Sequence, residues 1–121
     1  MRITIADDDK NMLIIVEDIL QRAFPKARLV SFQAPRAALE HIQTHGTEFV
    51  VTNHGMGEMS GTELIKLLRA HDVRVPIIMI SSNPDVRSEA MEAGADDFVD
   101  KLHIEILPAV IRSHLVRRTD S

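Results

Sequence analysis

Apolar residues along the chain follow two alternating patterns, short continuous runs and longer helical stripes. The short runs are rich in β-branched residues, are typical of strands buried on both faces, and fall at residues 2–6, 28–32, 48–53, 76–81 and 97–100. Between and after them, apolar residues recur every three or four positions, which predicts helices at about residues 12–23, 35–45, 61–71, 84–93 and 104–117. Strands alternating with helices predict the α/β class, with a doubly wound five-stranded parallel sheet.

The helical stripes identify side chains that we expect in the core. In the first helix they are Met12, Ile15, Val16, Ile19, Leu20 and Ala23. In the second and third helices they are Ala38, Leu39, Ile42, Leu64, Ile65, Leu67 and Leu68. Gly46 and Gly94 are expected to end the second and fourth helices. Pro108 suits the first turn of a last helix that starts at about Glu105.

Polar residues follow the strands where the apolar runs stop. Asp7 and Asp8 open an acidic run directly after the first strand, and helix capping explains only one residue of that run. The third strand ends at Asn53, the fourth at Ser81, and Lys101 follows the fifth. Because parallel strands of a doubly wound sheet point their carboxyl ends at one edge, we expect these side chains to converge there.

Two clustered carboxylates need a cation, because like charges about 4 Å apart repel by roughly 4 kcal/mol at an effective dielectric of about 20. Carboxylate and carbonyl oxygens with open coordination positions suit Mg²⁺, which keeps several waters and shares its ligands with a phosphoryl group. The Ser81 hydroxyl and the Lys101 ammonium would bind the remaining phosphoryl oxygens. The strand ends therefore predict a magnesium-dependent phosphoryl-binding site.

The loop after Asn53 is rich in glycine, with Gly55, Gly57 and Gly61. Glycine permits backbone angles that are closed to other residues. Such a loop at the carboxyl edge of a sheet is either part of a site or only a tight turn. The polar residues at the other strand ends favour the site.

Composition narrows the class of protein. A length of 121 residues indicates one domain, and 45% hydrophobic with 26% charged residues indicates a soluble globular protein. No apolar run is long enough to span a bilayer, no signal peptide is visible, and the absence of cysteine fits a reducing compartment, so we expect a cytoplasmic protein without a membrane partner. The net charge of −4 argues against direct nucleic-acid binding, although the chain has a basic end formed by Arg112, His114, Arg117 and Arg118.

Several segments carry a resemblance to a known family. They are Ile5-Ala6-Asp7-Asp8-Asp9, Met56-x-x-Met59-x-Gly61, Pro76-Ile-Ile-Met-Ile-Ser81-Ser82, Ala93-Gly94-Ala95-Asp96-Asp97-Phe98 and Lys101. With these segments the chain resembles the receiver domain of bacterial two-component response regulators, a family that includes the single-domain chemotaxis regulator and has the flavodoxin-like fold. The resemblance covers essentially the whole chain, as a receiver domain at residues 1–118 and a tail at 119–121.

The resemblance implies the metal site. Asp7 and Asp8 would be the acidic pair that holds Mg²⁺, and the Gly55 carbonyl would be a further ligand. Counting back from Met59 and Gly61, the phosphoacceptor aspartate of the family falls on Asn53, which would be a weakened ligand. We therefore expect Mg²⁺ as a weakly bound cofactor.

The resemblance also implies the switch and the partners. Ser81 would be the switch hydroxyl, Phe98 the switch aromatic and Lys101 the residue that pairs with the phosphoacceptor. Each residue also has an interpretation without a signalling role, Ser81 as an ordinary strand-end hydroxyl, Phe98 as a half-buried aromatic and Lys101 as a solvated surface lysine. A receiver is a signalling module rather than an enzyme, and its partner in the phosphorelay would be a sensor histidine kinase or a phosphotransfer protein.

The chain departs from the family pattern at Asn53, at Gly57, where the family usually has proline, and at Leu102, where proline commonly follows the lysine. The amide of Asn53 is neutral and nearly non-nucleophilic, so the chain is not expected to carry the usual acyl phosphate. Losing a carboxylate should weaken Mg²⁺ binding and make the metal-free domain more stable than its Asn53→Asp counterpart. Glycine for proline at position 57 should loosen the loop.

Three functions follow from these features. The first is a pseudo-receiver that acts without phosphorylation. The second is a functional phosphoacceptor receiver by origin, with an engineered aspartate-to-asparagine change at Asn53 that traps the inactive form. The third, a flavodoxin-like ligand-binding protein or enzyme, is disfavoured because the sequence has no G-x-G-x-x-G after the first strand, no P-loop and no flavin-stacking aromatic at a strand end.

Two surface features have more than one interpretation. His54, next to Asn53, is an alternative phosphoacceptor, a ligand or a solvated loop histidine. A group of charges near the last helices either lines a homodimer face, as in many receivers, or is solvated surface. These charges are Arg87, Glu89, Glu92, Asp96, Asp97, Arg112 and Arg117.

Overall fold

The computed structural model describes the backbone of residues 1–120 and the side chains of residues 1–115. Its five parallel strands form one sheet in the order β2-β1-β3-β4-β5. The strands are β1 (Arg2–Ala6), β2 (Arg28–Phe32), β3 (Phe49–Asn53), β4 (Ile77–Ser81) and β5 (Asp97–Asp100). The predicted doubly wound parallel sheet is confirmed.

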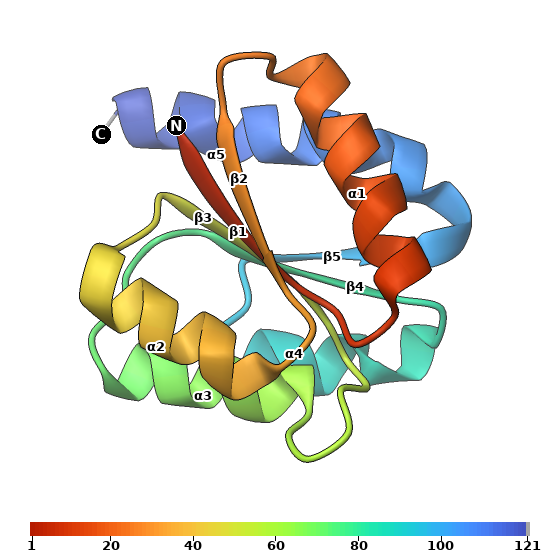
Figure 1. Cartoon of the computed structure of the whole chain (residues 1–121), viewed down its shortest axis with the longest axis vertical. Helices are drawn as coiled ribbons and strands as arrows, with labels where there is room; N and C mark the ends of the chain where they lie inside the picture. Colours follow the sequence, from red (N-terminus) through yellow and green to blue (C-terminus); the bar gives the residue numbers. More distant parts are fainter. Residues whose placement is uncertain (121) are drawn as a thin grey trace.

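Helices cover both faces of the sheet (Figure 1). One face carries α1 (Lys10–Ala23) and α5 (Leu107–Asp120), and the other carries α2 (Pro35–His45), α3 (Gly61–Ala70) and α4 (Arg87–Ala93). Two short 3₁₀ segments, η1 (Pro84–Val86) and η2 (Lys101–Ile106), precede α4 and α5. Each face has its own apolar core, which is why β3 and β4 are buried along their whole length.

The buried face of α1 differs from the predicted stripe. Leu13, Val16 and Leu20 are buried, whereas Ile15 is 46% exposed. The chain is apolar from residue 12 to 16, so the sequence pattern fits two adjacent helix faces and does not select between them. In α3, the predicted core residue Leu67 is only half-buried.

The segment before the last helix also differs from the prediction. The Asp100 carboxylate accepts a hydrogen bond from the Leu102 N–H and starts η2, and the backbone at His103 is non-helical. The helix α5 therefore starts at Leu107 rather than at Glu105, with Pro108 as its second residue. Its backbone continues to Asp120, beyond the predicted end at residue 117. The boundary between a domain at 1–118 and a tail at 119–121 stays a prediction, since Ser121 and the side chains of 116–120 lie outside the described residues.

Local signals in the sequence end several elements as expected. The Asp9 carboxylate accepts hydrogen bonds from the N–H groups of Asn11 and Met12 and caps α1. Gly46 and Gly94 follow α2 and α4 with φ of +75° and +121°, conformations that favour glycine. These caps fix where each helix turns back toward the next strand.

Candidate functional site

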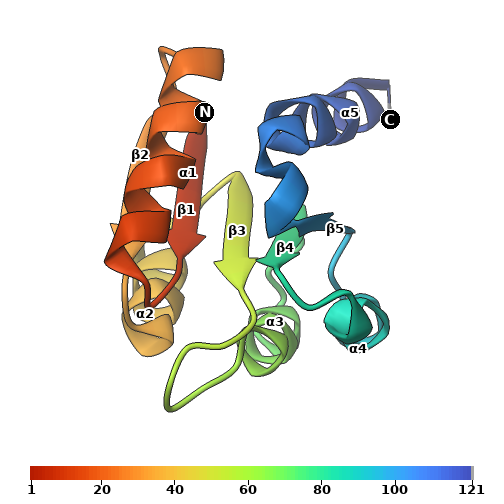
Figure 2. The same ribbon diagram turned by 90° about the vertical axis from the view of Figure 1, so that its right-hand side faces the viewer.

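The strand ends that hold the predicted site lie at one edge of the sheet. Figure 2 shows β1 and β3 pointing toward the same edge, with the β3–α3 loop beyond it. The register pairs Ala6 with Thr52 and Asn53 with Ile80, so Asp7 and Asn53 leave neighbouring strands at nearly the same level. The predicted convergence therefore follows from the topology.

Asp7 is a fully buried acid at the centre of this edge. Its Oδ1 accepts a hydrogen bond of 2.9 Å from the Asp9 N–H, while its Oδ2 has no hydrogen-bond partner among the described residues. The Lys101 ammonium lies 3.6 Å from Oδ2. Burial raises the pKa of Asp7 above its ordinary value, although the Asp9 N–H and Lys101 both oppose the shift. A buried carboxylate oxygen without a hydrogen bond is a position where a cation would be stabilised.

Asn53 ends β3 and is 8% exposed. Its Nδ2 donates a hydrogen bond of 2.8 Å to the Gly55 carbonyl. A carbonyl oxygen only accepts hydrogen bonds, so this contact requires the amide NH₂ and is not available to a carboxylate. The Gly55 carbonyl, predicted as a metal ligand, is therefore already engaged by the Asn53 side chain.

The β3–α3 loop closes tightly on the end of β3. A Cβ at Gly61 would collide with the Asn53 carbonyl oxygen, and the Gly61 N–H donates a hydrogen bond of 2.6 Å to the His54 carbonyl. Gly57 has φ of +66°, which proline cannot adopt. Gly55 has neither a positive φ nor a close neighbour. Two of the three loop glycines are thus required, each for its own reason.

The two predicted switch residues lie in different surroundings. The Ser81 hydroxyl is buried and accepts a hydrogen bond of 3.1 Å from the Asn83 N–H. The Phe98 ring is buried, 8% exposed, and the Arg87 guanidinium lies 6.0 Å from the ring centroid. Phe98 is therefore turned inward in this structure, and the switch roles themselves stay predictions.

His54 makes a contact that the sequence did not predict. Its Nε2 lies 2.7 Å from a carboxylate oxygen of Glu89, and its side chain is 29% exposed. The pair connects the β3–α3 loop to α4 across the edge that carries the site. No local pattern signals this contact, because the two residues are far apart in the chain.

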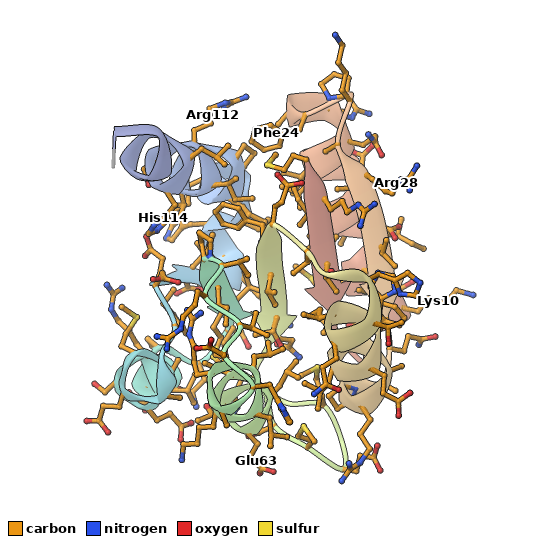
Figure 3. All side chains as sticks on the ribbon, turned by 90° about the vertical axis from the view of Figure 1, so that its left-hand side faces the viewer. Lys10, Phe24, Arg28, Glu63, Arg112 and His114 are labelled. Atoms are coloured by element: carbon orange, nitrogen blue, oxygen red, sulfur yellow. The ribbon has the colours of Figure 1, made fainter. Side chains whose placement is uncertain are left out.

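Several charges near the last helices have partners within the chain. The contacts are Asp96 with Arg69, Asp97 with His114, and Arg112 with the Phe24 ring and the Ala23 carbonyl. Figure 3 shows Arg112 beside Phe24, with His114 on the same helix. The side chain of Arg117 lies outside the described residues. The homodimer through these helices stays a prediction.

The described side chains contain no group of three or more His, Cys, Asp and Glu residues that could hold a metal ion. At the site the acids are Asp7 and the exposed Asp8. The site thus offers two carboxylates, with the Gly55 carbonyl engaged by an amide. Among the described residues, no helix is long and apolar enough to cross a membrane.

Comparison with known proteins identifies the relatives of this arrangement. The family model described as the response regulator receiver domain matches residues 3–111. The heme response regulator HssR of Staphylococcus saprophyticus is 31% identical over 99 residues, which are 80% of this chain and 43% of that protein. The chain thus matches less than half the length of this curated relative.

Solved structures show the same fold. The receiver domain of the Francisella response regulator 1452 superposes with a TM-score of 0.86 at 22% identity, covering 97% of this chain and 98% of that chain. The chemotaxis response regulator CheY4 of Vibrio cholerae superposes with a TM-score of 0.83 at 22% identity, covering 93% and 96%. At this identity the likeness concerns the fold.

Proposed function

This chain belongs to the family of response regulator receiver domains, and we propose that it acts in two-component signalling without phosphorylation at the usual position. Receivers of this family interact with histidine kinases or phosphotransfer proteins and generally bind Mg²⁺ at the phosphorylation site. The observation that carries the proposal is the side chain at the end of β3, where Asn53 donates a hydrogen bond to the Gly55 carbonyl.

The chemistry of an amide supports this proposal. Acyl phosphate formation requires a carboxylate oxygen that attacks phosphorus and becomes bonded to it. The Asn53 amide carries no negative charge, and its NH₂ already donates to a carbonyl. The ammonium of Lys101, the predicted partner of a phosphoacceptor, lies 3.6 Å from the Asp7 carboxylate. The Lys101 ammonium is thus paired with a carboxylate of the site in the absence of a phosphoryl group.

The residues fit a weak Mg²⁺ site. The Oδ2 of Asp7 has no hydrogen bond and suits a cation, and Asp7 with Asp8 would hold it. Asn53 adds no charge, and its amide competes for the Gly55 carbonyl. When bound, Mg²⁺ would supply positive charge that attracts phosphoryl oxygens. Asp7 would orient the cation through a position fixed by the Asp9 N–H.

Without a phosphoryl group, a partner must supply the energy for any change of state. A shift from 1:99 to 99:1 takes about 5.5 kcal/mol of differential affinity between the two states. Ser81 and Phe98 are the residues that would report such a shift. Ser81 would report it through its hydrogen bond with Asn83, and Phe98 through the buried position of its ring. We propose that this chain, in its unphosphorylated form, recognises a kinase or phosphotransfer protein.

Incubation with acetyl phosphate and Mg²⁺, followed by intact-mass measurement, tests the proposal. We expect no mass change for the wild-type chain and the gain of one phosphoryl group for Asn53→Asp. A phosphoryl group on the wild-type chain would contradict the proposal. His54→Gln would then show whether the neighbouring histidine is the acceptor. Acid treatment would be a second check, because phosphohistidine is lost in acid.

The retained site residues favour a second candidate, a working phosphoacceptor receiver by origin with Asn53 introduced later. Asp7, Ser81 and Lys101 are all present and placed at the strand ends. Gly57 favours the first candidate, because it is a second departure from the family pattern that trapping the inactive form would not require. The genomic codon for position 53 separates the two, since an aspartate codon would establish the second.

A further inference from the structure

A crevice at the opposite end of the sheet gathers positive groups. It has a volume of about 170 Å³ and lies between α2 and the first half of β1 and β2. Its lining includes Arg2, Thr4, Arg28, Val30, His41 and His45. Arg2 and Arg28 are the first residues of their strands, whereas the predicted phosphoryl site lies at the strands' carboxyl ends. The crevice is therefore separate from that site.

The two arginines are placed directly opposite each other. Arg2 and Arg28 are register partners in the parallel ladder of β1 and β2, so two positively charged side chains leave neighbouring strands at the same level. The guanidinium of Arg2 is held by a hydrogen bond of 2.9 Å from Nη1 to the His45 carbonyl. The guanidinium of Arg28 makes no hydrogen bond or salt bridge with the described residues. Figure 3 shows the Arg28 side chain at the free edge of the sheet. None of the described residues that line the crevice is acidic.

Two histidines on α2 line the other side of the crevice. The rings of His41 and His45 stack with centroids 4.7 Å apart, and Phe32 lies 5.2 Å from His41 on the other side. Burial, followed by the nearby His45 and Arg2, lowers the pKa of His41 below its ordinary value.

Acidic groups do not line the crevice among the described residues. The acidic neighbour is Glu48, in the loop after α2, whose carboxylate accepts a hydrogen bond of 3.0 Å from the Arg2 backbone N–H. Arginine presents a planar fork of donors that matches phosphate oxygens, and two such forks suit more than one negative charge. The volume is below the roughly 300 to 1,000 Å³ of sites for drug-sized ligands, so the ligand is small.

The geometry points to a binding site for a phosphate-class oxyanion between Arg2, Arg28, His41 and His45. The anion would lie between the two guanidinium groups and accept hydrogen bonds from them, with the histidine pair closing the α2 side. Inorganic phosphate and the phosphate group of a small phosphomonoester share this chemistry. The site is independent of position 53, so it stands whether or not the chain is phosphorylated.

Nuclear magnetic resonance titration of the ¹⁵N-labelled full chain with inorganic phosphate at low ionic strength tests this site. Glycerol 3-phosphate is the second probe, and sodium chloride at equal ionic strength is the control. We expect saturable shifts at Arg2, Arg28, His41 and His45 with phosphate and not with chloride. Tighter binding of glycerol 3-phosphate would identify a phosphomonoester ligand, and equal or weaker binding would identify free phosphate; both support the site.

Two charge-matched variants separate a built site from general attraction. Arg28→Gln should weaken phosphate binding about tenfold, because it removes a charged donor. Arg36→Gln removes the same charge from an exposed position on α2 outside the crevice and should change binding less than about twofold. Equal losses in both variants, shifts confined to residues around Lys101, or no saturable binding would overturn the proposal. Thermal unfolding without phosphate checks that both variants are folded.

Discussion

Replacing Asn53 by aspartate is the most informative single change at the site. The substitution removes the hydrogen bond from Nδ2 to the Gly55 carbonyl and leaves two oxygen acceptors facing each other. It also adds a negative charge beside Asp7, which is buried and has no hydrogen bond at Oδ2. In the metal-free protein both effects should lower the free energy of unfolding.

The magnitude follows from three contributions. Repulsion from Asp7 and attraction to Lys101 have opposite signs, and each would be roughly 4 kcal/mol for charges about 4 Å apart at an effective dielectric of about 20, so the two contributions oppose each other. The lost hydrogen bond and the buried unsatisfied acceptor cost about 1 to 3 kcal/mol. We therefore expect Asn53→Asp to unfold with a free energy about 2 kcal/mol lower than that of the wild-type chain.

Magnesium should reverse this difference. A ligand that binds only the folded state at about 100 times its Kd stabilises by about 2.7 kcal/mol, and Asn53→Asp offers the additional carboxylate. Urea unfolding with and without Mg²⁺ measures both quantities. Gln43→Glu, an exposed change of the same charge on α2, is the control and should show neither effect. Equal stabilities without Mg²⁺, or equal Mg²⁺ affinities of the wild-type chain and Asn53→Asp, would refute the reasoning.

Three further predictions concern stability, measured by urea unfolding. Thr62→Val should raise the free energy of unfolding by about 1 kcal/mol, because the buried Thr62 hydroxyl has no partner among the described residues, whereas Thr4→Val should lower it by a similar amount, because the Thr4 hydroxyl donates to Thr47; changes of the same sign would contradict this. Gly61→Ala should destabilise by about 1 to 3 kcal/mol because its Cβ meets the end of β3, and Gly55→Ala, in open space, should be nearly neutral. The pKa of the Asp7 carboxyl is raised above its ordinary value of 3.8, so the folded state keeps this carboxyl protonated at pH values where the unfolded chain has lost the proton. The stability that the bound proton contributes is therefore lost as pH rises through the raised pKa. Asp7→Asn should accordingly gain stability over the wild-type chain at pH 7, and the gain should shrink toward pH 4; a pH-independent difference would argue against a buried charged carboxylate.

The strands were predictable because the apolar runs are short and are bounded by polar residues, which favours strands over buried helix segments. Helix ends were predictable where one residue type has a defined backbone role, as at Gly46 and Gly94. The choice between Leu13 and Ile15 was not predictable, because neighbouring apolar positions fit two helix faces and only packing on the sheet selects one. The start of α5 depended on the kink at His103, which follows no strong local signal.

The site was predictable at the level of strand ends and not at the level of contacts. Topology alone brings Asp7 and Asn53 to one edge, and the structure bears this out through the strand register. The pairing of His54 with Glu89 depends on how the β3–α3 loop lies against α4, which no spacing in the sequence encodes. The requirement for glycine at position 61 likewise appears only when the Asn53 carbonyl is in place.

The contacts at the strand ends suit an amide at position 53. Asp7 and Lys101 lie 3.6 Å apart and neutralise each other, while Asn53 is neutral and satisfies the Gly55 carbonyl. A second buried acid at position 53 would have to share Lys101 and would require a cation, as two nearby carboxylates do. With asparagine, the metal-free arrangement is internally paired except at one oxygen of Asp7. Partner recognition by this receiver should therefore be independent of Mg²⁺, in contrast to its Asn53→Asp counterpart.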